Sequence, residues 1–371
     1  MIWNRMRGLL ASRRRNILGV MSGTSADGLE LALVSCSGSG KSMKIELLDH
    51  FSVRFDSFFH DEIVKTYDPD LSGVDRVNLM NFVIGRRHAA AIKSYLEKTR
   101  VVVEAIAYHG QTVYHDPENR ATLQIGEADV ISSETGLPVV FDFRKKDMVY
   151  GGEGAPIIPY FDWIYFESGS YAVNLGGIAN VTYVDDDLEN VKAFDTGPAN
   201  CLLDLVTKKH YNLEFDENGK IAASGSVDDE ILNALLERDR SYFERRPPKS
   251  TGRELYNEVF LEGISATKPE DLVRTLVRFS VRRLVESITS YLPIGKRMIV
   301  TGGGALNPVM LEDLQRLSGL EVVVPDRTFL QAKEAMGMAV LAQEFFNGVG
   351  ANVPSVTGAR QRVVLGKLAL P

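Results

Sequence analysis

The chain has 371 residues, of which 44% are hydrophobic and 25% are charged, and its formal net charge is −7. This length predicts two lobes, because a single core rarely grows so large. The acidic balance argues against a nucleic-acid partner, which needs a concentrated basic surface. The only cysteines, Cys36 and Cys201, lie far apart. They argue against a disulfide framework or a zinc cluster and favour a cytoplasmic location.

The amino terminus is basic but does not have the pattern of a secretory signal. Five arginines lie within residues 5–15, and the apolar run Ile17–Met21 follows them. This run is too short for a signal peptide, because the polar residue Ser22 ends it at once. We therefore expect residues 1–15 to form a mobile basic extension. No run approaches the roughly 18 apolar residues of a membrane span, so we expect no membrane partner.

The first predicted element is a β-hairpin. Its strands, Ile17–Met21 and Leu29–Val34, flank the turn Ser22–Gly28, which is rich in glycine and hydroxyl groups. Such a turn can contact an anion through backbone N–H groups, because glycine allows positive φ and a close approach. We interpret it as a site for ATP phosphates, with Asp27 orienting a hydrated Mg²⁺. The alternative is a plain hairpin loop.

The elements after this hairpin predict a mixed sheet with helices on its faces. Lys44–Phe55 has the pattern of a third strand, and the apolar residues of Asp75–Lys98 recur at helical spacing. The remaining elements predicted in this half are a buried strand over Val101–Ala107, a helix over Gly126–Gly136 and a strand over Pro138–Phe143.

Three polar residues in this region are candidates for binding a substrate. His109 and Gln111 follow directly after the predicted buried strand, where they can form hydrogen bonds to a ligand. The spacing from His109 to His115 fits a zinc pair poorly. Arg144 begins a basic run that can meet an anionic substrate group, and a solvated face is the alternative.

A second glycine-rich hairpin is predicted after the flexible segment Gly151–Gly154. Its strands, Tyr171–Leu175 and Val181–Val184, enclose the turn Gly176–Asn180. Two such hairpins indicate two related halves, each with a phosphate clamp, and an ATP site in a cleft. We expect the boundary between the lobes within residues 140–170.

Asp195 is the candidate general base. It lies at the end of a short strand, in the turn Phe194–Asn200, which Pro198 makes rigid. An acid at such a position can accept a proton from a hydroxyl group or a water molecule. The alternative is an Asx turn or a helix N-cap before the predicted helix Cys201–His210.

The last third contains a glycine turn between a strand and a helix. A helix over Asp271–Leu292 precedes the buried strand Met298–Thr301, which runs into Gly302–Gly304. Asn307-Pro308 is a typical helix start. The three glycines allow a nucleoside to approach the backbone closely, and a tight turn without a ligand is the alternative. Two further elements are expected, a strand over Val322–Val324 and a helix over Ala332–Phe346.

Taken together, these motifs resemble those of the anhydro-N-acetylmuramic acid kinase family, within the actin/Hsp70/sugar-kinase superfamily. The resemblance runs in family order from residue 19 almost to the C-terminus. The family usually has Leu, Asp, Gln and Gly where this chain has Ala26, Glu30, Glu153 and Ala199. The matching segments are Gly19–Gly28, Tyr108–Pro117, Thr122–Gly126, Asp142–Asp147, Gly151–Pro156, Asn174–Asn180, Asp195–Asn200, Lys249–Glu254, Gly302–Pro308 and Pro354–Ala359.

The resemblance implies an α/β chain with the two-lobed, actin-like ATPase (ribonuclease H-like) fold, in which mixed sheets flanked by helices enclose a central cleft. Residues 1–140 would form the first lobe and residues 141–344 the second. The second lobe would hold the second hairpin, the acid and the glycine turn. A C-terminal helix over residues 345–371 would pack back on the first lobe.

The implied activity is that of a cytoplasmic kinase of peptidoglycan recycling. It would use ATP and Mg²⁺ to open the 1,6-anhydro ring of anhydro-N-acetylmuramic acid and phosphorylate O6, giving N-acetylmuramic acid 6-phosphate. O6 of the anhydro sugar carries no proton and becomes a nucleophile only as C1–O6 breaks. Water attack at C1 and phosphoryl transfer should therefore be coupled, with Asp195 as the base and Glu334 as the next candidate. The alternatives are a superfamily ATPase without a sugar substrate and a phosphate-ester or polyphosphate hydrolase.

These inferences define an expected set of site residues. Asp195 is the catalytic residue, and Asp27 is expected to hold the metal through water. The expected partner is a small anhydro amino sugar, and no nucleic acid or membrane partner is expected. The sequence is compatible with a homodimer as well as with a monomer. The expected ATP-binding residues are Gly23, Thr24, Ser25, Ala26, Asp27, Gly28, Leu29, Glu30, Gly176, Gly177, Asn180, Gly302, Gly303 and Gly304. The expected substrate-binding residues are His109, Gln111, Arg144 and Glu334.

Overall fold

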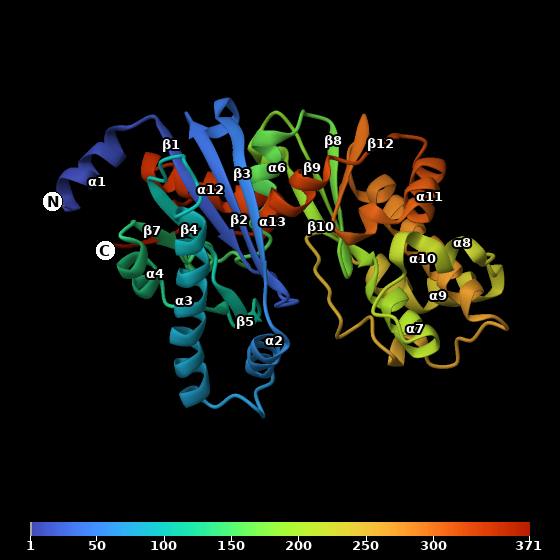
Figure 1. The fold of residues 1–371 in the computed structure, drawn as a ribbon. Helices are drawn as coiled ribbons and strands as arrows, with labels where there is room; N and C mark the ends of the chain where they lie inside the picture. Colours follow the sequence, from blue (N-terminus) through green and yellow to red (C-terminus); the bar gives the residue numbers. More distant parts are fainter. Residues whose placement is uncertain (1) are drawn as a thin grey trace. The chain divides into compact units, whose positions relative to one another are not determined.

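The computed structural model describes residues 2–371, which form two compact units (Figure 1). Unit 1 runs to Tyr165 and resumes over Arg327–Pro371, and unit 2 is Phe166–Asp326. The sequence placed the boundaries at 140/141 and 344/345. The first boundary, 165/166, lies within the expected residues 140–170 but beyond 140/141, and the second lies at 326/327. Both differ because helix α6 (Pro159–Tyr165) packs with helix α12 (Arg327–Asn347), and an ion pair of 2.9 Å joins Asp162 to Lys333.

Unit 1 is built on a six-stranded sheet with the order β13-β7-β4-β1-β2-β3. Strands β1, β2 and β3 are antiparallel neighbours, whereas β4 runs parallel to β1 and β7 runs parallel to β4. Short β13 closes the other edge in the antiparallel sense. The bounds are β1 (Arg14–Met21), β2 (Gly28–Ser37), β3 (Lys44–Arg54), β4 (Ala105–Tyr108), β7 (Val139–Phe141) and β13 (Lys367–Ala369).

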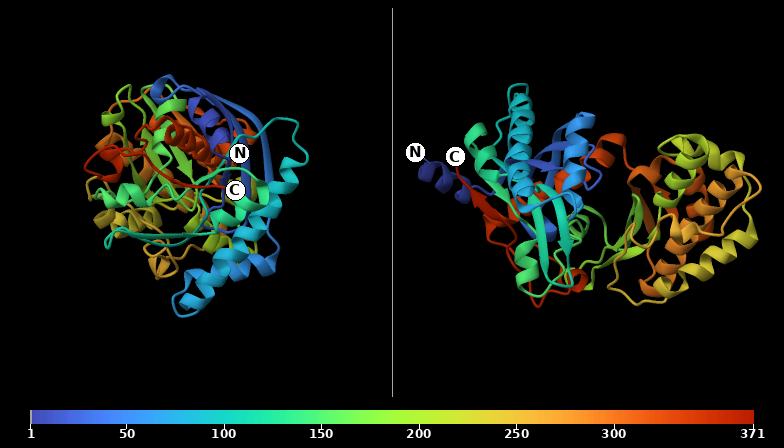
Figure 2. Two further views of the ribbon diagram at one scale, coloured as in Figure 1. Left: turned by 90° about the vertical axis from the view of Figure 1, so that its left-hand side faces the viewer. Right: turned by 90° about the horizontal axis from the view of Figure 1, so that it is seen from below.

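Two long helices cover opposite faces of this sheet (Figures 1 and 2). Helix α3 (Val74–Leu96) shares a buried core with Leu18 and Val20 of β1. Gly19 points to the other face, since neighbouring residues of a strand alternate. Helix α12 packs there so closely that a β-carbon on Gly19 would lie 1.8 Å from the Ala335 carbonyl oxygen. Glycine at this position therefore sets the distance between β1 and α12.

Smaller elements complete unit 1. A two-stranded ribbon lies apart from the main sheet and begins directly after β4. The bounds are α2 (Ser57–Val64), β5 (Gln111–Asp116), β6 (Ala121–Ile125), α4 (Ala128–Thr135), α5 (Lys145–Val149) and α13 (Pro354–Thr357). Among residues 2–371, no helix is both long and apolar enough to cross a membrane.

The basic amino terminus is anchored, so the prediction of a mobile extension over residues 1–15 is wrong for the part that the structure describes. Helix α1 (Ile2–Ala11) buries Met6 and Leu9. Arg15 is completely buried, with Nε donating to the Leu9 carbonyl at 2.8 Å and Nη1 donating to Gln343 Oε1 at 2.9 Å. Because its guanidinium finds acceptors on both α1 and α12, this arginine joins them to β1 rather than remaining in solvent.

Residues 345–371 do not form the predicted C-terminal helix. Helix α12 ends at Asn347, and the chain continues through short α13 into β13. Gly348 and Gly358 adopt positive φ angles of 69° and 76°, which a helix cannot contain. Glycine and proline therefore end the helix and return the chain to the edge of the unit 1 sheet.

Unit 2 repeats the order of five of the six strands of unit 1, those from β3 to β7. Its sheet has the order β10-β9-β8-β11-β12, in which β8, β9 and β10 are antiparallel neighbours and β11 runs parallel to both β8 and β12. Two halves with the same order and strand directions confirm the predicted ribonuclease H-like fold. The bounds are β8 (Ser170–Leu175), β9 (Ile178–Tyr183), β10 (Lys192–Pro198), β11 (Arg297–Thr301) and β12 (Glu321–Val323).

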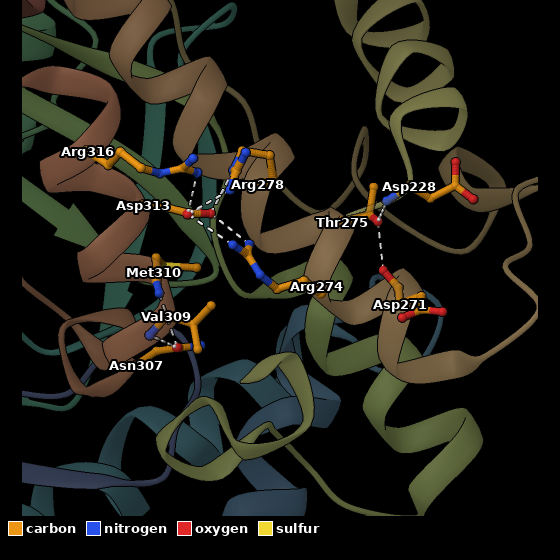
Figure 3. Close-up of polar contacts among 10 residues, drawn as sticks. All are labelled: Asp228, Asp271, Arg274, Thr275, Arg278, Asn307, Val309, Met310, Asp313 and Arg316. Atoms are coloured by element: carbon orange, nitrogen blue, oxygen red, sulfur yellow. Dashed lines mark hydrogen bonds and ion pairs between the residues drawn. The ribbon is translucent and has the colours of Figure 1, made fainter. Parts of the chain in front are cut away.

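Helices pack on this second sheet, with the long α10 in contact with four of the others. The predicted Asp271–Leu292 helix is observed as α10, and the predicted start at Asn307-Pro308 is confirmed. The Asn307 side chain accepts from the amides of Val309 and Met310 (Figure 3). The bounds are α7 (Cys201–Tyr211), α8 (Lys220–Ser224), α9 (Asp229–Phe243), α10 (Pro269–Tyr291) and α11 (Pro308–Ser318).

A buried carboxylate joins α10 to α11 (Figure 3). Arg274 and Arg278 each donate two hydrogen bonds of 2.7–3.0 Å to Asp313, and Arg316 adds one of 3.0 Å. Burial alone would raise the pKa of Asp313, but the hydrogen bonds and charges of Arg278 and Arg274 hold it at about 2. The cluster therefore stabilises unit 2 as long as the carboxylate is ionised.

We expect Asp313→Asn to lower the free energy of unfolding by about 3 kcal/mol at pH 7, because Arg274 and Arg278 would lose their counter-charge. The folded pKa lies below the ordinary value of about 3.9. The contribution is therefore complete above about pH 4 and is lost as the pH falls toward 2. Urea unfolding from pH 7 to pH 3 measures this, with exposed Glu312→Gln as the control. Equal effects of the two variants at pH 7 would contradict the assignment.

Candidate active site

The first glycine-rich turn lies between β1 and β2, and the side chain of Gln111 forms hydrogen bonds to it. This side chain is fully buried, and its Nε2 donates to the Gly23 carbonyl at 2.9 Å and to Tyr67 Oη at 2.7 Å. Ser22 Oγ lies 2.7 Å from Gln111 Oε1. Both ends of the amide are thus engaged inside the protein, so the structure places Gln111 as a support for the turn.

Only part of this hairpin presents side chains to solvent. Thr24, Ser25 and Asp27 are exposed, whereas Ala26 and Leu29 are completely buried in the core of unit 1. Ala26 has a φ of 55°, belongs to a buried hydrophobic cluster and donates its amide to the Gly23 carbonyl at 3.1 Å, so it supports the turn from inside the core. The exposed residues therefore give the turn its available hydroxyl and carboxylate groups.

The remaining two residues of the predicted ATP set in this hairpin face β3. A β-carbon on Gly28 would lie 2.4 Å from the Val53 carbonyl oxygen, so the glycine allows β2 and β3 to approach. The Glu30 carboxylate contacts His50 Nε2 at 2.6 Å and Ser52 Oγ at 2.5 Å. Gly28 and Glu30 therefore contact β3, at the end of the hairpin that joins the sheet.

Unit 1 also contains a half-buried arginine, Arg144, aligned by a histidine. Arg144 Nε donates to His109 Nε2 at 3.0 Å, and Arg144 Nη1 donates to the Gly154 carbonyl at 2.9 Å. Since arginine can only donate, Nε2 is the acceptor, and the His109 proton is on Nδ1, 2.9 Å from the Gly110 carbonyl. Burial and then the Arg144 charge lower the pKa of His109 to about 3. His109 is therefore neutral and orients Arg144.

Glu334 lies near this arginine on α12. Burial lowers the pKa of Arg144 to about 10, and the charge of Glu334 opposes that shift. The Glu334 side chain remains accessible to solvent. Its pKa is nevertheless raised by desolvation, and the charges of Lys333 and Arg144 oppose this shift only in part. The structure thus brings together three of the four predicted substrate residues, His109, Arg144 and Glu334.

The second glycine-rich turn, between β8 and β9, directs two amide N–H groups away from the side chain of Asn200. The carbonyls of Leu175 and Gly176 both accept from Asn200 Nδ2, at 2.9 and 2.7 Å. In a trans peptide the N–H points opposite to the C=O. The N–H groups of Gly176 and Gly177 therefore point away from Asn200, and neither has a protein acceptor within residues 2–371. Such paired amides are suited to bind an anion.

Asp195 lies at the end of a polar row across the unit 2 sheet. Asn174 of β8 is paired with Asn180 of β9, and Asn180 is paired with Asp195 of β10. Residues directly opposite each other share one face of a sheet. The register shifts just after Asp195, where Gly197 has a φ of 138°. This β-bulge ends the regular pairing beside the carboxylate. Asn174, which belongs to the same polar row, was not predicted as a site residue from the sequence.

Three contacts hold Asp195 in place, two from the loop over residues 249–251 and one from helix α9. Its amide donates to the Lys249 carbonyl at 3.1 Å, and its Oδ2 accepts from the Thr251 amide at 3.0 Å. Its carbonyl accepts from Tyr242 Oη at 2.7 Å. Residues 249–251 therefore fix both the backbone and the carboxylate of the candidate base.

Lys249 anchors this segment inside a cage of aromatic rings. Its Nζ lies 4.7–5.9 Å from the ring centroids of four aromatic residues and donates to two backbone carbonyls. Burial lowers the pKa of Lys249 to about 8, although the Asp239 charge opposes the shift. This lysine is a support of Asp195 that sequence spacing alone could not identify. The four rings are those of Phe194, Tyr242, Phe243 and Tyr291.

The glycine turn after β11 uses its outer glycines for packing. β-Carbons on Gly302 and Gly304 would each lie 2.6 Å from side-chain atoms of Asn174 or Leu175, and Gly302 has a φ of 82°. Gly303 is exposed, and a β-carbon there would meet nothing within 4 Å. Gly303 is thus the one glycine of the three whose space is open to a ligand.

Replacing Gly303 by Val tests this part of the ATP assignment. We expect a variant that melts like the parent, because its side chain enters open space, but that has an ATP KM raised about tenfold or more, since the branched group would occupy the space proposed for the nucleoside. Steady-state kinetics and thermal melting measure both properties, with Gly303→Ala as the smaller control. An unchanged KM for ATP in a folded Val variant would remove Gly303 from the site.

Metal ligands are not clustered in either unit. Among residues 2–371, no group of three or more His, Cys, Asp or Glu side chains is placed to hold an ion. The exposed Asp27 carboxylate at the first turn can still contact a hydrated ion through water.

Two sheets of the same strand order, each with a glycine-rich hairpin, define an α/β protein of the actin-like, ribonuclease H-like class. A family model described as anhydro-N-acetylmuramic acid kinase matches residues 15–370. The protein of that name from Caldanaerobacter subterraneus subsp. tengcongensis is 35% identical, over 99% of this chain and 100% of its own. Its namesake from Bacillus thuringiensis subsp. konkukian is 38% identical, over 96% and 99%. The chain belongs to the anhydro-N-acetylmuramic acid kinase family.

Two solved structures are also similar to this chain. One is the activator of the 2-hydroxyisocaproyl-CoA dehydratase from Clostridium difficile with bound ADPNP, with a TM-score of 0.46, 13% identity and coverage of 90% of this chain and 96% of that one. The other is component A of the (R)-2-hydroxyglutaryl-CoA dehydratase of Acidaminococcus fermentans, with a TM-score of 0.48, 14% identity and coverage of 91% and 100%.

Proposed function

We propose that this protein is an ATP-dependent kinase that opens the 1,6-anhydro ring of anhydro-N-acetylmuramic acid and phosphorylates O6. Family membership over almost the whole chain supports the substrate and the reaction. The observation that carries the mechanism is Asp195, whose carboxylate is fixed by the Thr251 amide at the end of a polar sheet row. A carboxylate held in this way can act as a general base without reorganisation.

In this proposal each hairpin turn binds phosphate oxygens of ATP. The first turn offers the hydroxyl groups of Thr24 and Ser25, and the second offers the outward N–H groups of Gly176 and Gly177. Asp27 would hold Mg²⁺ through water, and the ion would supply charge neutralisation for the transferring phosphoryl group. Gly303 would leave room for the nucleoside.

Arg144 and Glu334 are proposed to bind the sugar. N-acetylmuramic acid carries a lactyl carboxylate, and a half-buried guanidinium with a fixed orientation is well suited to pair with it. His109 and the Gly154 carbonyl use Nε and Nη1 of Arg144, which leaves Nη2 to face a ligand. Glu334 can accept hydrogen bonds from sugar hydroxyl groups.

The proposed chemistry joins two displacements. Asp195 takes a proton from a water molecule. At the same time the water oxygen forms a bond to C1, and the C1–O6 bond breaks. The electron pair released on O6 attacks the γ-phosphorus of ATP, and ADP departs. The products are N-acetylmuramic acid 6-phosphate and ADP, with the proton left on Asp195 and then released to solvent.

A coupled assay of ADP release, with and without anhydro-N-acetylmuramic acid, tests this function. We expect ADP formation to require the sugar, with one ADP for each phosphorylated sugar. Equal ADP release without sugar would instead indicate a superfamily ATPase. Release of phosphate from phosphate esters or polyphosphate without any nucleotide would indicate a hydrolase.

A further inference from the structure

We propose that Arg253 is a phosphate-binding residue of the second hairpin turn, contributing a positive charge beside the N–H groups of Gly176 and Gly177. The inference rests on the proposed function, because the phosphates are taken to be those of ATP. Arg253 follows the segment that supports Asp195, and its spacing in the sequence gives no sign that it reaches a hairpin formed some 75 residues earlier.

The guanidinium of Arg253 lies directly beside the turn. A β-carbon on Gly177 would be 3.7 Å from Arg253 Nη2 and 3.8 Å from Arg253 Nε. The Cβ of Cys201, at the start of α7, would be 3.8 Å from the same point. The arginine, the glycine turn and the first residue of α7 therefore meet at one place in unit 2.

The charge of Arg253 acts on the groups around this place. Burial raises the pKa of Cys201 to about 11, and Arg253 is the next largest influence and lowers it. Burial likewise raises the pKa of Asp204 to about 6, and Arg253 again lowers it. The positive charge thus lies close to the beginning of α7, where the carbonyl groups of the turn accept from backbone amides.

Arg253 is not occupied by a partner within the protein. Its side chain is exposed, and within the part of the chain that the structure describes it forms no hydrogen bond and no ion pair of 4.0 Å or less. A guanidinium that is free to donate through several N–H groups binds phosphate oxygens in a forked geometry. Combined with two amides that lack protein acceptors, it completes a set of donors suited to an anion.

Calorimetric titration of the full-length protein with a non-hydrolysable ATP analogue tests the proposal. We expect Arg253→Gln to weaken binding about tenfold or more, because a charge-assisted contact with phosphate is lost. Arg253→Lys should recover part of the affinity, since it keeps the charge but not the fork. Arg246→Gln is the matched control, because it removes an exposed arginine from the same loop. All three variants should melt like the parent.

The outcomes separate this proposal from the function on which it rests. If the parent binds the analogue and Arg253→Gln stays within twofold of it, the role of Arg253 is wrong and the kinase function stands. An equal loss in Arg246→Gln would also overturn the role, because it would show a general effect of net charge. If the parent protein binds no nucleotide, the proposed function fails, and the assignment of Arg253 fails with it.

Discussion

Replacing Asp195 by Asn is expected to abolish ring opening and phosphoryl transfer together, lowering kcat by at least about a hundredfold. Asparagine keeps the size of the side chain and can still accept from the Thr251 amide, but it cannot take a proton from water. O6 becomes a nucleophile only when water attacks C1, so losing the base stops both steps. The affinity for ATP should change little, because other residues are proposed to bind its phosphates.

Product analysis by mass spectrometry and NMR distinguishes the failures of this prediction. Sugar that is opened at C1 but not phosphorylated would show that the two steps are separable. Near-normal turnover would show that another residue is the base, and Glu334→Gln is then the variant to compare. Asp185→Asn, which changes an acid in the exposed loop before β10, serves as the control and should retain full activity.

Replacing Gly19 by Ala is expected to lower the free energy of unfolding by about 3 kcal/mol or more, the upper range for overpacking a core. The added methyl group would lie 1.8 Å from the Ala335 carbonyl oxygen, so α12 would have to move away from β1. The smaller conformational entropy of the unfolded alanine chain offsets only about 0.4–1 kcal/mol of this loss. Glu334 precedes Ala335 on the same helix, so we also expect activity to fall.

The matched control for this variant is Gly8→Ala. Gly8 lies inside helix α1, and a β-carbon there would meet nothing within 4 Å. Alanine should therefore leave the protein equally stable or stabilise it by up to about 1 kcal/mol. Urea unfolding of both variants gives the comparison, and a Gly19→Ala protein as stable as the parent would show that α12 does not depend on this close contact.

The sequence predicted the parts of the fold that depend on local patterns. Both hairpins, the long α3 and α10 helices and the cap at Asn307 follow from periodicity, glycine position and capping chemistry. The strand predicted over Val101–Ala107 was too long, because only its end belongs to β4, and Val102 is largely exposed. An apolar run alone does not show which of its residues will find a neighbouring strand.

Contacts between distant segments could not be predicted in this way. Arg15 has the appearance of a solvated charge, yet it is buried because α1 and α12 bring acceptors to it. Gln111 was a candidate substrate ligand, but its amide supports the first turn. Lys249 comes to support Asp195, and Arg253 comes to lie beside Gly177, only when their loop folds back on these residues. Each of these depends on tertiary structure rather than on spacing.

The most direct test of the central claim is a reaction run in H₂¹⁸O with ATP and anhydro-N-acetylmuramic acid, stopped within a few turnovers. Water attack at C1 coupled to phosphoryl transfer predicts one ¹⁸O on the C1 hydroxyl group of N-acetylmuramic acid 6-phosphate. It predicts no label in the phosphate group. Label in phosphate, or labelled sugar that lacks phosphate, would contradict the coupled kinase mechanism.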